Sequence, residues 1–284
     1  MKSKNLLVVV ILFAIFACSK NDNATPTPVT PPLVVDPADL IVTNFMPLSV
    51  ANRWTYDTAN TVVTPTPTVT QPTIGIDELF VLNDSLSNNL VYKKMNTNPL
   101  TPTGFYSTML KGNSLRIDGS SLKLSGKIKY NVGTSVLNLA ISDFTLFKEN
   151  GVSGTIVGDT GSITSNQIIQ GIAVTVVYKL TSKAEGSVPN MTYNNKNYTD
   201  VKRNIITINL AVSATFSGIP KPVSLLDSQD AIVSTQYYSK NNGMIKASTT
   251  IKYAINAAAA SLFPGNFPLV GEQTNLENLK LTNF

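Results

Sequence analysis

Apolar and polar residues alternate in several segments of this chain, and this period restricts the fold more than any other feature. In residues 121–132, SLKLSGKIKYNV, the side chains of Leu122, Leu124, Ile128 and Tyr130 fall on one face. Residues 204–216 place a second apolar set in the same register: Ile206, Ile208, Leu210, Val212, Ala214 and Phe216. Because successive side chains of a strand point to opposite faces, this period predicts half-buried β-strands.

Short turn sequences separate the alternating segments. Lys111-Gly112-Asn113 and Asn241-Asn242-Gly243 contain residues that tolerate the positive φ angles of tight turns. Consecutive hairpins of this kind predict an antiparallel meander. The strands are expected near residues 51–58, 76–82, 90–95, 104–110, 113–118, 121–131, 136–147, 153–157, 168–182, 198–216, 231–240, 244–254 and 275–283.

The predicted fold class is therefore mainly β: one antiparallel, strongly curved sheet that forms half a barrel, with little helix. A long open sheet curls because strand twist accumulates, so one of its faces becomes concave. The apolar set of residues 206–212 would line that face, where either the segment 254–270 or a bound ligand is expected to cover it. Only residues 254–263, AINAAAASLF, have a helical composition, and Pro264 limits them to one or two turns.

The start of the chain has the pattern of a secretory signal. Lys2 and Lys4 precede an apolar run from Leu6 to Ala17. This run is shorter than the roughly 20 residues that a membrane-spanning helix needs. It matches instead the apolar region of a signal peptide, so the sequence predicts export.

The residues Ile15-Phe16-Ala17-Cys18 resemble the lipobox of bacterial lipoproteins. The resemblance implies cleavage before Cys18 and attachment of diacylglycerol, with palmitate-type acyl chains, to its sulfur. The alternative is an unmodified cysteine inside an ordinary signal peptide. The predicted organisation is a signal peptide at 1–17, the lipidated cysteine with a Pro/Thr-rich stalk at 18–38, and a single β-rich domain at 39–284.

Composition removes most catalytic and metal-binding chemistry. The chain contains no histidine and one cysteine, so histidine bases, histidine zinc sites, disulfides and a cysteine nucleophile in the mature chain are not expected. The formal net charge of +5 falls to +3 once Lys2 and Lys4 are removed, and the basic residues are scattered. We therefore expect no cofactor, no metal and no nucleic-acid partner.

Three acidic motifs require a choice between a site and a structural role. Asp159-Thr160-Gly161 matches the triplet of aspartic proteases, but that chemistry needs a second carboxylate, so we interpret it as a turn. Asp77-Glu78 lies on a predicted strand, where the two carboxylates point to opposite faces. Asp227-Ser-Gln-Asp230 has the oxygen chemistry of a calcium site, although two loop carboxylates are more often solvated. No catalytic residue and no metal ligand is assigned.

Aromatic and apolar residues supply the candidate ligand-binding positions. Trp54 and Tyr56 share one face of a strand, where they would stack on sugars if exposed or anchor the core if buried. Leu262, Phe263 and Phe267 lie in LFPGNFPLV, residues 262–270, which is expected to cover the sheet or to line a pocket.

Two longer stretches resemble exported lipoproteins of the Bacteroidota. FMPLSVANRWTY, residues 45–56, is similar to their opening motif, in which a glycine occupies the position of Ala51. YYSKNNGMIK, residues 237–246, is similar to their late hairpin, and Asn197–Val201 to the strand start before it. The resemblance covers about the first and last thirds of the chain. It implies a fold like that of the lipoprotein carrier LolA and attachment to the outer membrane, at its periplasmic or cell-surface face.

Three functions remain open from the sequence, one of them an enzyme that uses carboxylates alone, which two carboxylates within about 10 Å in a cleft would favour. The first is a non-enzymatic outer-membrane lipoprotein that binds an apolar ligand or a protein partner. The second is a glycan-binding accessory lipoprotein of a nutrient-uptake complex. A dry apolar trough would favour a lipid, whereas a row of exposed aromatic side chains would favour a glycan.

Overall fold

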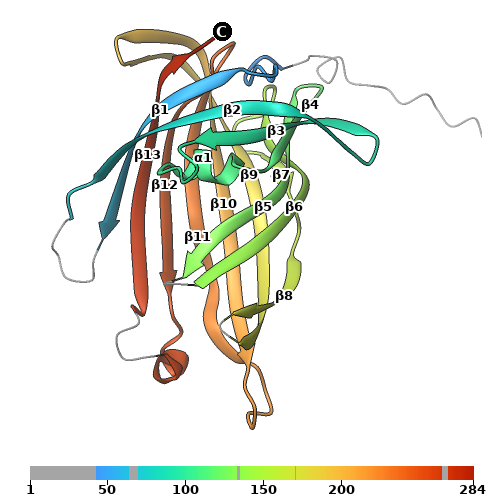
Figure 1. Ribbon diagram of the computed structural model, residues 1–284, viewed down its shortest axis with the longest axis vertical. Coiled ribbons are helices and arrows are strands. Elements are labelled where there is room, and N and C mark those ends of the chain that lie inside the picture. The colour runs from blue at the N-terminus through green and yellow to red at the C-terminus, as the bar shows by residue number, and fades with distance from the viewer. Residues whose placement is uncertain (1–42, 64–69, 133–134, 170, 264–267) are drawn as a thin grey trace, which may run out of the picture. The chain divides into compact units, whose positions relative to one another are not determined.

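The computed structural model describes residues 43–63, 70–132, 135–169, 171–263 and 268–284 (Figure 1). The chain divides into two units, residues 1–35 and 36–284, and all described residues belong to the second. The predicted signal peptide at 1–17, the stalk at 18–38, Cys18 and Phe267 lie outside the described residues.

The described residues form one 13-stranded sheet. Its order is β6-β5-β4-β3-β2-β1-β13-β12-β11-β10-β9-β7, with β8 paired to β9, and all pairs are antiparallel. The strands are β1 (Arg53–Val63), β2 (Thr73–Ser87), β3 (Leu90–Asn98), β4 (Ser114–Asp118), β5 (Ser121–Val132), β6 (Ser135–Lys148), β7 (Ile156–Asp159), β8 (Ile163–Ile169), β9 (Ile172–Tyr193), β10 (Lys196–Thr215), β11 (Val223–Ser239), β12 (Gly243–Ala254) and β13 (Val270–Thr282). The helical elements are α1 (Phe105–Leu110) and the 3-10 turn η2 (Ala257–Leu262).

The predicted fold class is confirmed, and the sheet curls until its two ends meet. No backbone ladder joins β6 to β7 or β9; side chains link them instead. Tyr178 Oη of β9 donates to the carbonyl of Ala140 at 2.8 Å, and Ser182 Oγ donates to Leu146 at 2.8 Å. Gln167 of β8 bonds both the backbone nitrogen and the oxygen of Asn138. The result is a nearly closed, barrel-like sheet held by a polar seam along β6.

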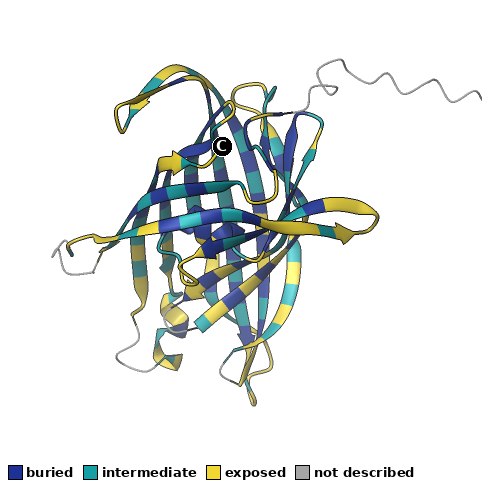
Figure 2. Cartoon of the chain, turned by 45° about the horizontal axis from the view of Figure 1, so that its top comes forward, coloured by how far each residue is buried: buried dark blue, intermediate teal, exposed yellow. Residues whose placement is uncertain are grey.

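The core fills the inside of this sheet. Buried and exposed positions alternate along the long strands (Figure 2). The alternating set predicted to line the concave face is buried as expected, with Ile206, Ile208 and Leu210 fully inaccessible. Apolar side chains of β5 and β6 belong to the same core cluster, so the strands opposite cover this part of the concave face. The segment 254–270 was predicted to cover it; η2 within that segment buries only Ala259.

One predicted strand is wrong. Residues 104–110 were predicted to be extended, but Phe105–Leu110 form α1. A helix of six residues is too short to be stable alone, so its conformation comes from tertiary contacts. Those contacts are side-chain acceptors on β2 and β13 that bind its first backbone N–H groups.

Other elements differ from their predicted boundaries for local reasons. The predicted strand 168–182 is divided at Gly171, whose φ of 81° makes the turn between β8 and β9. The predicted helical turns at 254–263 are present as η2. Ala51 has a φ of 70°, a left-handed conformation that costs an alanine energy. The resembled motif carries a glycine at this position, which has no such cost.

Candidate functional site

Three polar side chains inside the sheet bind the start of α1. Asp77 of β2 accepts hydrogen bonds from the backbone nitrogens of Thr103 at 3.0 Å and Gly104 at 2.7 Å. Asn275 of β13 accepts from the nitrogen of Phe105 at 2.7 Å and donates to the carbonyl of Thr103 at 2.9 Å.

Glu277, two residues further along β13, binds the next turn of α1. It accepts from the backbone nitrogens of Tyr106 and Ser107, and from Ser107 Oγ at 2.7 Å. Gly104 packs so closely against Glu277 that a Cβ atom there would overlap the carboxylate. The free N–H groups at the start of a helix need such acceptors, and here they come from strands distant in the sequence.

Burial dominates the electrostatics of these two acids. Both Asp77 and Glu277 are completely inaccessible to solvent. Desolvation raises the pKa of Glu277 to about 7; the hydrogen bonds from Ser107 and Tyr106 act against the rise, and the charge of Asp77 adds to it. Desolvation also raises the pKa of Asp77 above its ordinary value, against the bonds from Thr103 and Gly104.

This acidic pair binds a helix of the protein and has no access to a substrate. Asp77 and Glu78 do point to opposite faces, as predicted, and Glu78 forms an outer ion pair with Arg53 at 2.6 Å. The role of Asp77 was not predicted from the sequence. One feature of the sequence could have indicated this role: Asp77 alternates with Leu79 and Val81, so it lies on the apolar face of its strand.

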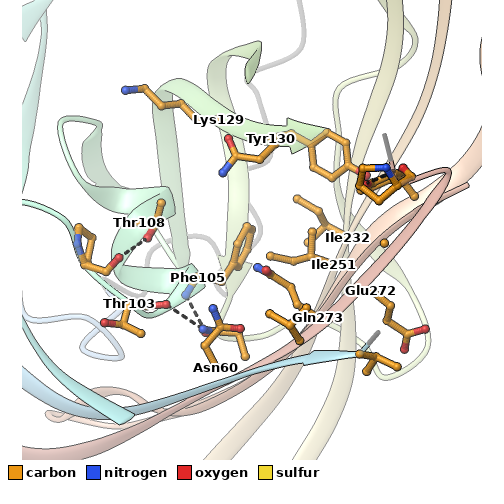
Figure 3. A pocket seen from close by; sticks show the side chains of 18 of the residues that line it. Asn60, Thr103, Phe105, Thr108, Lys129, Tyr130, Ile232, Ile251, Glu272 and Gln273 are labelled. Atoms are coloured by element: carbon orange, nitrogen blue, oxygen red, sulfur yellow. Dashed lines mark hydrogen bonds between the residues drawn. The ribbon is translucent and has the colours of Figure 1, made fainter. Parts of the chain in front are cut away.

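A concave-face pocket of about 610 Å³ lies between α1, β1, β5 and strands β11 to β13 (Figure 3). Its apolar lining includes Phe105 of α1, Tyr130 of β5, Ile232 of β11 and Ile251 of β12. Tyr130 Oη donates to the carbonyl of Lys252 at 2.6 Å, which ties β5 to β12 across this space. The volume falls in the range of roughly 300–1,000 Å³ that is typical of ligand pockets.

A second, smaller space of about 170 Å³, the end pocket, lies where several strand ends and η2 meet. Its lining comes from β5, β6, β8 to β11 and the region of η2, and Ser135 is its only polar member among the described residues. The predicted positions Leu262 and Phe263 both line it. Leu262 remains 42% exposed, so it lies at the mouth of the pocket.

Trp54 and Tyr56 are core residues. Both are completely inaccessible, which corresponds to the core-anchor alternative and leaves neither ring available to a sugar. Trp54 Nε1 donates to the carbonyl of Asn242 at 2.9 Å, and Tyr56 Oη donates to that of Met244 at 3.1 Å. These bonds attach the first strand to the Asn-Asn-Gly hairpin, so the two resembled motifs meet in space.

The other acidic motifs have structural partners. Asp159 ends β7 and accepts from the nitrogen of Gly161 at 2.7 Å, which confirms the predicted turn. Lys179 lies 2.9 Å from Asp159 and lowers the pKa of its carboxyl. Asp227 and Asp230 were predicted on a loop, but they lie within β11, where Asn256 and Asn209 donate to them.

Two common functional features are absent from the described residues. Within the described residues, no three side chains of the metal-binding types lie close enough together to hold an ion. No helix in that part of the chain is long and apolar enough to cross a membrane.

Comparison with known proteins adds little. No protein-family model matches this sequence, and no curated protein does. Among solved structures, the chain is similar to a crystal structure from Parabacteroides distasonis described as a candidate lipoprotein. The two share 10% identity with a TM-score of 0.34, and the match covers 84% of this chain and 99% of that one. At this level no family is assigned.

Proposed function

We propose that this chain is a non-enzymatic exported lipoprotein that binds an apolar ligand in its end pocket. The observation that carries the proposal is the lining of that pocket. Of the described residues around it, only Ser135 has a polar side chain. An apolar cavity of about 150 Å³ is known to stay dry and to bind benzene, so a space of 170 Å³ suits an apolar ring or the end of a chain.

The energetics favour hydrocarbon over a polar ligand. Each buried methylene contributes about 0.8 kcal/mol, so a six-carbon segment would contribute about 5 kcal/mol before the cost of association. A polar group would lose its bonds to water and find no partner other than Ser135 among the described side chains. Leu262 at the mouth gives the ligand an apolar route of entry.

In this proposal the protein is attached to the membrane by lipid on Cys18. The support is the apolar run from Leu6 to Ala17 followed directly by the cysteine. The proposed location is the outer membrane, with the domain on its periplasmic or cell-surface side.

Binding of toluene to the full-length protein tests the ligand proposal. Leu262→Asp places a charge at the mouth and should weaken toluene binding at least about tenfold, because an unpaired charge beside apolar surface is costly. The matched control is Leu86→Asp on β2, at a leucine that is 72% exposed and does not line the pocket. Absence of toluene binding, or equal effects of the two variants, would overturn the proposal.

A further inference from the structure

The concave-face pocket is separate from the end pocket, since the two have no lining residue in common among those described. It is more than three times as large, at about 610 Å³ against 170 Å³. Unlike the end pocket, it combines an apolar floor with several amide and hydroxyl side chains. Its ligand must therefore differ from the hydrocarbon proposed above.

The inner surface of this pocket is uncharged. Of the described residues that line it, only Lys129 and Glu272 carry a charge. Lys129 is exposed between the buried Ile128 and Tyr130, so its side chain is on the outer face of β5, and Figure 3 shows it pointing away from the cavity. Glu272 is exposed and pairs with Lys252, which places it on the outer face of β13.

Gln273, the neighbour of Glu272, faces inward. It lies opposite Val62 on β1 and Ile251 on β12, in register with the buried Asn275 and Glu277. Its side chain makes no hydrogen bond with any described residue, whereas the amide of Asn275 is occupied by α1. Gln273 therefore has a free donor and a free acceptor beside the apolar floor.

The walls contain further unmet hydrogen-bonding capacity and are preformed. Asn60 also lines the pocket, and its side-chain oxygen is buried without a partner among the described residues. Phe105 belongs to α1, whose start is fixed by Asp77, Asn275 and Glu277. A wall that is already ordered lowers the entropy cost of binding.

From these observations we propose that the concave-face pocket binds an uncharged amphiphile whose apolar body lies on Phe105, Tyr130, Ile232 and Ile251 and whose polar group hydrogen-bonds Gln273. An ionic head group would be desolvated beside these residues without a counter-charge. A fully apolar molecule would leave the amide of Gln273 without the partner that an alcohol or amide group supplies.

The test compares three six-carbon probes that differ only in the head group: hexanol, hexanoate and hexylammonium. Titration calorimetry on the full-length protein at pH 7, with the protein-free carrier subtracted, should show hexanol binding at least about tenfold more tightly than either ion. Gln273→Leu should weaken hexanol binding by about two- to tenfold through loss of one hydrogen bond.

A charge reversal provides the site-specific readout. Gln273→Lys should raise the affinity for hexanoate about tenfold, because the ammonium would face the pocket. Glu272→Lys is the control: it changes the net charge by two units, against one for Gln273→Lys, but its side chain lies on the outer face of β13. It should leave hexanoate binding unchanged.

Two results would overturn the inference. One is equal binding of the three probes. The other is hexanol binding that responds to Leu262→Asp and not to Gln273→Leu, which would place the alcohol in the end pocket and leave the proposed function intact. If the protein does not bind toluene, but hexanol binding still responds to the Gln273 variants, only the proposed function is rejected.

Discussion

Glu277 should make the stability of this protein fall as the pH rises through neutrality. Its pKa is about 7 in the folded protein against 4.5 for the unconstrained group. Each pKa unit corresponds to about 1.4 kcal/mol, so the difference is about 3 kcal/mol of unfolding free energy. Because the folded state holds this proton more tightly, the contribution is fully present below pH 4.5 and is lost as the pH rises through 7.

The composition makes this window easy to interpret. The chain has no histidine, the side chain that normally titrates between pH 5 and 8. The carboxyls with lowered pKa values, such as Asp143 and Asp159, contribute stability that is lost only at more acidic pH. Asp77 has a raised pKa and acts in the same direction as Glu277.

Urea unfolding of wild type and Glu277→Gln at several pH values between 5 and 8 measures the effect. The amide keeps one acceptor oxygen but presents an NH₂ group to a backbone donor of α1, so at pH 5 the variant should be less stable by about 1–3 kcal/mol. At pH 8 this deficit should shrink or reverse, because no charge remains buried. Glu78→Gln on the outer face should keep the wild-type slope. A wild-type stability that is flat from pH 5 to 8, or an unchanged slope in Glu277→Gln, would refute this reasoning.

Three further predictions address single positions. Thr58→Val should stabilise the protein by about 1 kcal/mol in urea unfolding, because Thr58 Oγ1 is buried and has no hydrogen-bond partner among the described residues. Thr249→Val removes a 2.8 Å bond to Ser234 and should destabilise the protein by a similar amount. Ala51→Gly should raise the unfolding free energy by about 1 kcal/mol by relieving the positive φ, and a loss of stability would contradict the strain. Cys18→Ala should release the protein from membranes in fractionation, and intact-mass analysis of the wild-type membrane form showing an unmodified cysteine would contradict lipidation.

Local periodicity was enough to predict most of the sheet. β5 and β10 follow from alternation alone, since one face of each is apolar. α1 was missed because six residues carry too little helical signal, and its conformation depends on acceptors from β2 and β13. No pattern within residues 105–110 indicates that the helix depends on these distant acceptors.

The candidate sites divide in the same way. Leu262 and Phe263 were predicted because residues 262–270 are the most apolar stretch outside the predicted strands, and both line the end pocket. The pair of Asp77 and Glu277 could not be predicted, because the two residues are 200 positions apart in the sequence and meet only through the register of β1 with both neighbours. An acid on the apolar face of a strand indicates a buried partner but does not identify it.

The pairing of β1 with β13 has a consequence for how the chain folds. Strands β1 to β6 and β7 to β13 form two runs of neighbours, and the only backbone ladder between the runs joins β1 to β13 in the described sheet. The early strand β1 therefore cannot complete its pairing until the late strand β13 is available. Closing the long loop between the two strands costs conformational entropy before their contact forms. The local hairpins of β1 to β6 can form before β13 is synthesised, but the sheet cannot close until the last strand has paired with the first.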